Sequence, residues 1–74
     1  MAAYHDIKLL NEVALTEDIP AHGLVRGQVG TVMEIYPDGS CEVEFSGDDG
    51  RAYALVPLLA RQLLVLRYQP ARAA

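Results

Sequence analysis

The chain has 74 residues, with six basic and ten acidic side chains and a formal net charge of −4. This length allows one small domain and leaves no room for a second core. The negative charge disfavours attraction to phosphate backbones unless the basic residues cluster, and along the sequence they are scattered. The single cysteine cannot form an internal disulfide, and no apolar run is long enough to span a membrane. We therefore expect a cytoplasmic protein with one domain over residues 7–68 and flexible ends at 1–6 and 69–74.

The first half of the chain predicts two strands separated by a long loop. Leu9–Leu15 is the first candidate strand, and the polar segment Thr16–Gly23 ends it because proline and glycine favour loops. Leu24 then offers an apolar anchor. Val29–Tyr36 is the longest β-rich run, but it carries apolar side chains on both faces of an ideal strand.

A bend in this second strand would reconcile its two apolar faces. A β-bulge near Gly30 would allow Val32 and Ile35 both to reach the core. The segment Pro37–Ser40 follows, and its Pro-Asp-Gly-Ser sequence is typical of a hairpin turn.

The returning strand has the clearest alternation in the chain. Cys41, Val43 and Phe45 share one side and are expected to be buried, whereas Glu42 and Glu44 share the other.

The last third of the chain predicts two more strands with a helical turn between them. After a turn at Ser46–Gly50 we expect a strand over Arg51–Val56, a single helical turn over Pro57–Ala60, and a short strand over Gln62–Leu66. These elements together predict an all-β fold, a small five-stranded SH3-like barrel with one short helical turn before the last strand. Closure of such a barrel limits exposed sheet edges.

Several segments in this order carry a family resemblance, among them Ile7–Leu15, Arg26–Val32, Glu42–Phe45 and Tyr53–Leu55. Together they resemble the small bacterial proteins of domain-of-unknown-function family 4926 over roughly residues 7–66. That resemblance implies a stand-alone SH3-like protein without an assigned activity or functional residues. A weaker likeness, limited to Gly27–Val32, is to the KOW element of ribosomal and transcription-elongation proteins, which are usually basic.

No group of residues predicts an enzyme, a metal site or a cofactor site. Cys41 could act as a nucleophile only beside His5 or His22, and we interpret it as a small apolar core residue instead. His22 has no second ligand at metal-binding spacing. The Asp48-Asp49 pair lacks the remaining ligands of a calcium loop and is interpreted as part of a turn.

The aliphatic carboxyl-terminal third is the best functional clue in the sequence. It contains more leucine and valine than one face of a small barrel needs, so the surplus either forms an interface or plugs the barrel end. The main hypothesis is a non-enzymatic module that binds itself or a protein partner, as an accessory or antitoxin-like subunit, through Leu58, Leu59, Tyr53, Glu42 and Glu44. The alternative is a KOW-like nucleic-acid-binding module with a basic patch built from Arg26, Arg51 and Arg61.

Overall fold

One antiparallel sheet of five strands makes up the chain in the computed structural model, which describes residues 7–70. The expected flexible ends at 1–6 and 69–74 lie outside the described residues, apart from Gln69 and Pro70. The elements in chain order are β1 (Glu12–Leu15), the 3-10 turn η1 (Pro20–His22), β2 (Val29–Ile35), β3 (Cys41–Ser46), β4 (Ala52–Leu58), the 3-10 turn η2 (Ala60–Gln62) and β5 (Leu63–Val65). The all-β prediction is confirmed. Within residues 7–70, no helix has the length and apolar character needed to cross a membrane.

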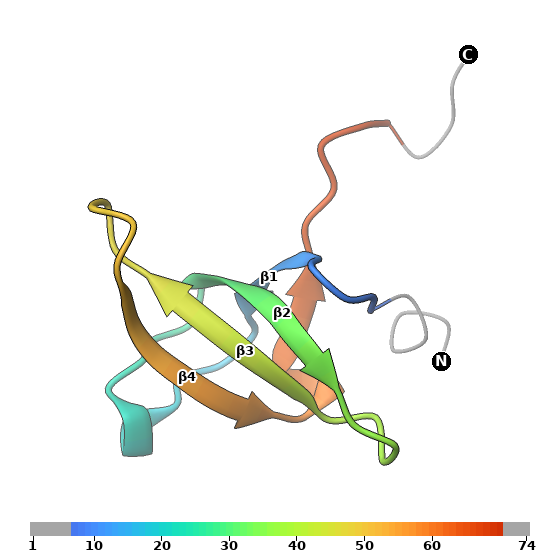
Figure 1. The fold of residues 1–74 in the computed structure, drawn as a ribbon, viewed down its shortest axis with the longest axis horizontal. Helices are drawn as coiled ribbons and strands as arrows, with labels where there is room; N and C mark the ends of the chain where they lie inside the picture. Colours follow the sequence, from blue (N-terminus) through green and yellow to red (C-terminus); the bar gives the residue numbers. More distant parts are fainter. Residues whose placement is uncertain (1–6, 71–74) are drawn as a thin grey trace.

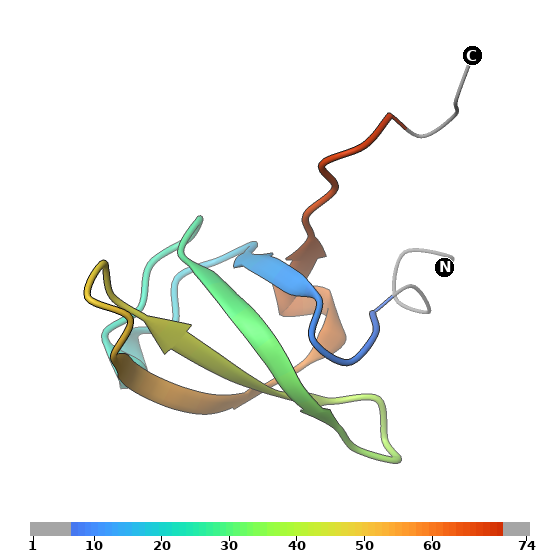
Figure 2. The ribbon, with the colours of Figure 1, turned by 45° about the horizontal axis from the view of Figure 1, so that its top comes forward.

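The strands lie in the order β4-β3-β2-β1-β5, and the sheet curls so that one face encloses the core (Figures 1 and 2). The central strand β2 pairs with β1 over its first three residues and with β3 from Gly30 to Ile35. The outermost strands β4 and β5 are not hydrogen-bonded to each other, so the ladder does not close. The sheet therefore lacks the closure by which a barrel limits its exposed edges, and among residues 7–70 the outer sides of β4 and β5 pair with no further strand.

The inner face of the sheet forms the hydrophobic core. Cys41, Val43 and Phe45 are each 0% exposed, which confirms the alternation predicted for β3. Leu24, the predicted anchor after the long loop, is also buried. The remaining buried side chains come from the other four strands: Val13, Leu15, Val32, Val56, Leu58 and Leu63.

The predicted bulge in β2 is present, but it lies after Val32 and not near Gly30, and only one of the two side chains expected in the core is buried. The register between β2 and β3 shifts between Val32 and Glu34. Val32 is fully buried opposite Val43. Ile35 pairs with Cys41 at the end of the strand, where little chain covers it, and it stays 40% exposed. Its predicted burial is therefore wrong.

The hairpin turn at Pro37–Ser40 forms by the predicted mechanism. Gly39 has φ of 88°, a conformation that favours glycine. The Asp38 carboxylate accepts hydrogen bonds from the Ser40 amide at 2.9 Å and from the Ser40 hydroxyl at 2.6 Å. This side chain therefore adds to the backbone hydrogen bonds of the turn, in which the Gly39 N–H donates to the Tyr36 carbonyl and the Tyr36 N–H donates to the Ser40 carbonyl, both at 2.8 Å.

The helical turn before β5 lies three residues later than predicted. Pro57 belongs to β4, because proline is tolerated in an edge strand, where its missing N–H can face away from the sheet. The 3-10 turn begins after Leu59, whose N–H donates to the Gln62 side chain at 2.9 Å. Leu58 is consequently an inward-facing strand residue.

The first strand is also shorter than predicted, beginning at Glu12. The Asn11 N–H donates to the Lys8 carbonyl, which closes a turn that leaves Leu9 and Leu10 exposed. Leu10 has φ of 69°, which costs a non-glycine residue about 1 kcal/mol.

Candidate functional site

Acidic side chains gather on the outer face of the sheet, over β2 and β3. Because Cys41, Val43 and Phe45 point inward, the alternation of β3 directs Glu42 and Glu44 outward, where both are partly exposed. Glu34 of β2 lies directly opposite Glu42 in the register. This pair places two carboxylates side by side, which is an unfavourable cross-strand arrangement.

The neighbouring strand β4 completes the surface with apolar groups. Leu55 lies opposite Glu44, and Pro57 lies opposite Glu42. Leu55 is 57% exposed. We call the surface formed by Glu34, Glu42, Glu44, Leu55 and Pro57 the acidic face.

Tyr36 contacts the acidic face and Tyr53 of β4 packs on the core, and each has a polar partner. The Tyr36 hydroxyl donates to the Glu42 carboxylate at 2.8 Å, which orients Glu42 and raises the pKa of Tyr36. Tyr53 is 52% exposed, and its ring lies 6.4 Å from that of Phe45, measured between ring centroids. Its hydroxyl accepts a hydrogen bond from the Gln28 amide at 2.9 Å. Tyr53 therefore packs on the core ring of Phe45 while part of its side chain remains exposed.

Negative charge is concentrated in the part of the chain that builds this face. The segment 29–50 contains six of the ten acidic residues and none of the six basic ones. The rest of the chain, with four acids and six bases, is therefore slightly positive. The net charge of −4 is thus the sum of a strongly acidic sheet half and a weakly basic remainder.

The structure divides the predicted partner-binding residues into two groups. Glu42, Glu44, Tyr53 and Leu59 carry exposed or partly exposed side chains, with Leu59 at 48%. Leu58 is only 4% exposed, so its predicted place on a surface is wrong. The reason is its pairing opposite the buried Cys41, which directs it into the core.

The aliphatic surplus of the last third is likewise divided between core and surface. Leu58 and Leu63 are buried, whereas Leu55 and Leu64 are 57% and 59% exposed. Leu55 and Pro57 are not among the partner-binding residues predicted from the sequence. The period-2 pattern of β4 carried the needed signal, but the predicted helical turn had removed Pro57 from that strand.

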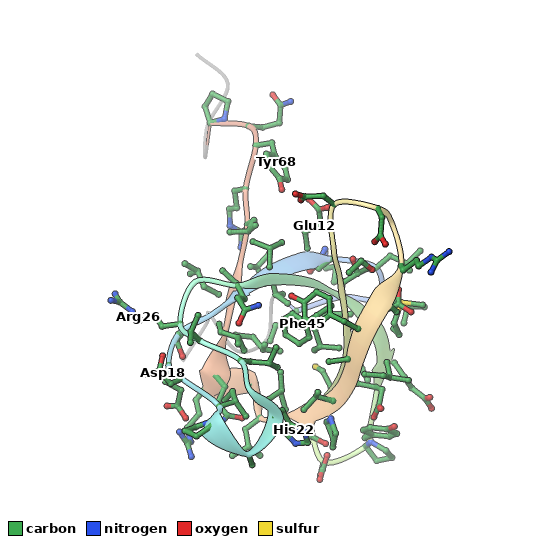
Figure 3. All side chains as sticks on the ribbon, turned by 90° about the vertical axis from the view of Figure 1, so that its left-hand side faces the viewer. Glu12, Asp18, His22, Arg26, Phe45 and Tyr68 are labelled. Atoms are coloured by element: carbon green, nitrogen blue, oxygen red, sulfur yellow. The ribbon has the colours of Figure 1, made fainter. Side chains whose placement is uncertain are left out.

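Two of the candidate catalytic residues, Cys41 and His22, lie in different environments. Cys41 is buried, and burial, followed by the nearby Asp38 charge, raises the pKa of its thiol. His22 is exposed in η1, toward the end of the molecule opposite Tyr68 (Figure 3), and His5 lies outside the described residues. Among residues 7–70, no cluster of three His, Cys, Asp or Glu side chains could hold a metal ion. A shallow hollow beside β5 is lined by Lys8, Asn11, Val65, Leu66, Arg67, Tyr68, Gln69 and Pro70.

Two of the three arginines needed for a nucleic-acid-binding patch lie beside carboxylates. Arg61 forms an ion pair with Glu17 at 3.4 Å, and Arg51 approaches Asp49 at 4.0 Å. The backbone N–H of Arg26 donates to Asp18 at 2.8 Å, and Figure 3 places these two residues in the long loop. The local field around these cations is therefore reduced by neighbouring acids.

The fold and the charge distribution define a small all-β domain with an acidic outer sheet face. The family model described as Domain of unknown function (DUF4926) matches residues 9–65, so the chain belongs to this family. The family resemblance of the sequence is thereby confirmed. No curated protein and no solved structure matches the chain.

Proposed function

We propose that this protein is a non-enzymatic interaction module that binds a basic region of another protein through the acidic face. The single observation that carries this proposal is the absence of any basic residue from segment 29–50, which builds most of that face and holds six acids. A surface with one sign of charge attracts a partner of the opposite sign and raises its rate of association.

The arrangement of the carboxylates supports the proposal further. Glu34 and Glu42 oppose each other across β2 and β3, although like charges in this position destabilise a sheet. A cationic partner side chain between them would remove that repulsion. Leu55 and Pro57 lie beside the carboxylates and supply apolar area, so the face combines charge with a surface that gains from burial.

A second copy of the chain is a poorer occupant of the acidic face than a basic partner. Each copy carries a net charge of −4, and contact between two acidic faces would bring like charges together. An accessory or neutralising subunit of a basic protein, in the cytoplasm, fits the size and charge of the chain. The antitoxin-like role belongs to this class.

Within the all-β class, we propose that the fold is an SH3-like barrel. The order β4-β3-β2-β1-β5, the long loop after β1 and the 3-10 turn η2 just before β5 support this assignment. The curl of the sheet around one core supports it as well (Figure 2). The barrel in this case is open between β4 and β5.

A pull-down from cell lysate with three forms of the protein tests the function. We expect the wild type and the control variant Glu17→Gln to recover the same basic proteins, because Glu17 lies in the long loop, outside the acidic face. The double variant Glu42→Gln/Glu44→Gln is expected to lose them, and the wild type is expected to lose them at high salt as counterions screen the face.

Three results would contradict the proposal. They are recovery of no protein, equal recovery by the double variant, and a dominant RNA or DNA component whose binding falls with salt. The last result would favour the KOW-like alternative. Thermal unfolding of each variant controls for its fold.

A further inference from the structure

The free edge of β4 carries the inference that goes beyond the acidic face itself. We propose that a partner segment of alternating basic and apolar residues adds to this edge as a sixth strand, with its basic side chains reaching back over the acidic face. This inference rests on the proposed function and specifies how the partner binds.

The sequence of β4 makes its edge suited to pairing with a further strand. The strand runs for seven residues, Ala52–Leu58, and contains no charged side chain. Within residues 7–70, it pairs only with β3, so the N–H and C=O groups on its other side face away from the sheet. Proteins commonly protect such edges with charges, short strands, bulges or proline. Here Pro57 lies close to one end of β4, and the register with β3 shifts at Tyr53 close to the other, so the protection is confined to the two ends.

The opposite edge of the sheet is protected because its strand, β5, is short. The strand β5 has only three residues, Leu63–Val65, and offers a short template. A partner strand therefore gains more backbone hydrogen bonds at β4 than at β5. Residues 52–56 remain available before Pro57 interrupts the row of N–H donors.

Charge complementarity determines which partner fits this edge. An added strand would lie about 4.8 Å from β4 and about 10 Å from β3. A lysine or arginine on its outer face can cross that separation along the apolar surface of Leu55 and place its charge near Glu44. A residue two positions further along the partner has the same relation to Pro57 and Glu42. The spacing of the two glutamates thus matches alternate residues of an extended basic segment.

Synthetic peptides test this mode of binding without altering the protein. The probe is a capped seven-residue peptide of alternating lysine and valine, and the matched control carries N-methyl groups on alternate residues, which remove half of its N–H donors. We expect the probe to slow hydrogen exchange, by about tenfold or more, of those amides in 52–56 that face away from β3, because strand addition gives them hydrogen-bond partners. The N-methylated peptide keeps its charge and is expected to lose this protection. Equal effects of the two peptides would overturn the inference.

Two leucine variants test the location. Leu55→Lys places a cation on β4, whereas Leu64→Lys places the same cation on β5 at a site of nearly equal exposure, 57% against 59%. We expect Leu55→Lys to weaken probe binding about tenfold or more and Leu64→Lys to leave it nearly unchanged. The reverse order, or equal loss in both variants, would overturn the assignment to β4.

The outcomes separate this inference from the proposed function. Binding that depends on Glu42 and Glu44 without protection of residues 52–56 would overturn strand addition and leave the acidic face as the binding surface. Probe binding that is unchanged in Glu42→Gln/Glu44→Gln would contradict the proposed function itself. A wild-type dimer in solution that Leu55→Lys converts to a monomer would show that a second copy occupies the edge, and this result would also overturn the inference.

Discussion

The variant Gly30→Ala tests the packing that holds β3 in place under the acidic face. Gly30 is buried in β2 and lies between Val13 and Phe45 in the register. A Cβ atom added at Gly30 would lie 2.7 Å from the Val43 side chain, 2.8 Å from the Glu44 carbonyl oxygen and 3.0 Å from the Phe45 ring. The carbonyl belongs to the sheet backbone, so relief of this contact requires β2 and β3 to move apart.

The magnitude follows from two opposing effects. Overpacking of this kind costs about 1–3 kcal/mol. The reduced backbone freedom of the unfolded alanine chain offsets about 0.4–1 kcal/mol of that cost. We therefore expect the free energy of unfolding to fall by about 1–2 kcal/mol, and Tm to fall by about 5–15 °C for a domain of this size.

Urea and thermal unfolding, followed by circular dichroism, measure the effect against a matched control. In Gly47→Ala the new Cβ would meet only the Asp49 side chain, at 3.4 Å, in the exposed turn before β4. This control is expected to keep nearly wild-type stability. Equal stability of the two variants would refute the steric reasoning at Gly30.

Three further predictions concern the core and the hairpin turn. Leu58→Glu is expected to unfold the domain because Leu58 is only 4% exposed. Leu59→Glu is expected to keep Tm within a few degrees of wild type because Leu59 is 48% exposed. Circular dichroism of both variants measures the effect, and a folded Leu58→Glu or an unfolded Leu59→Glu would contradict these placements. Hydrogen bonds from the Ser40 hydroxyl, which has the larger effect, and from the Ser40 amide lower the pKa of Asp38 below its usual 3.8. The stability that this contact supplies is therefore present above pH 3.8 and is lost as the pH falls through the lowered pKa of the folded state. Asp38→Ala should therefore be less stable than wild type near pH 6 in urea titrations, with a difference that shrinks below pH 3.8; a constant difference down to pH 2 would argue against this linkage. Burial, followed by the Asp38 charge, raises the pKa of the Cys41 thiol. A thiol reagent at pH 8 is therefore expected to label the folded protein at least about tenfold more slowly than the urea-unfolded protein. Equal labelling rates would contradict the burial of Cys41.

The candidate site could be predicted in part, because alternation along a strand determines which side chains share a face. The pattern of β3 was sufficient to place Glu42 and Glu44 opposite the buried Cys41, Val43 and Phe45. The opposition of Glu34 and Glu42 is a matter of register, which depends on the bulge after Val32. A one-residue shift in register moves every side chain to the other face, so local sequence patterns leave this pairing undetermined.

By itself, the sequence determined the all-β class, the turn at Pro37–Ser40 and the core face of β3, since these depend on local backbone preferences and period-2 patterning. Only the tertiary structure decided that Pro57 and Leu58 continue β4 and that β4 keeps a free edge. Strand pairing and closure depend on contacts between residues far apart in the chain. The physical reason is that a free edge is a property of the assembled sheet, and no single strand specifies it.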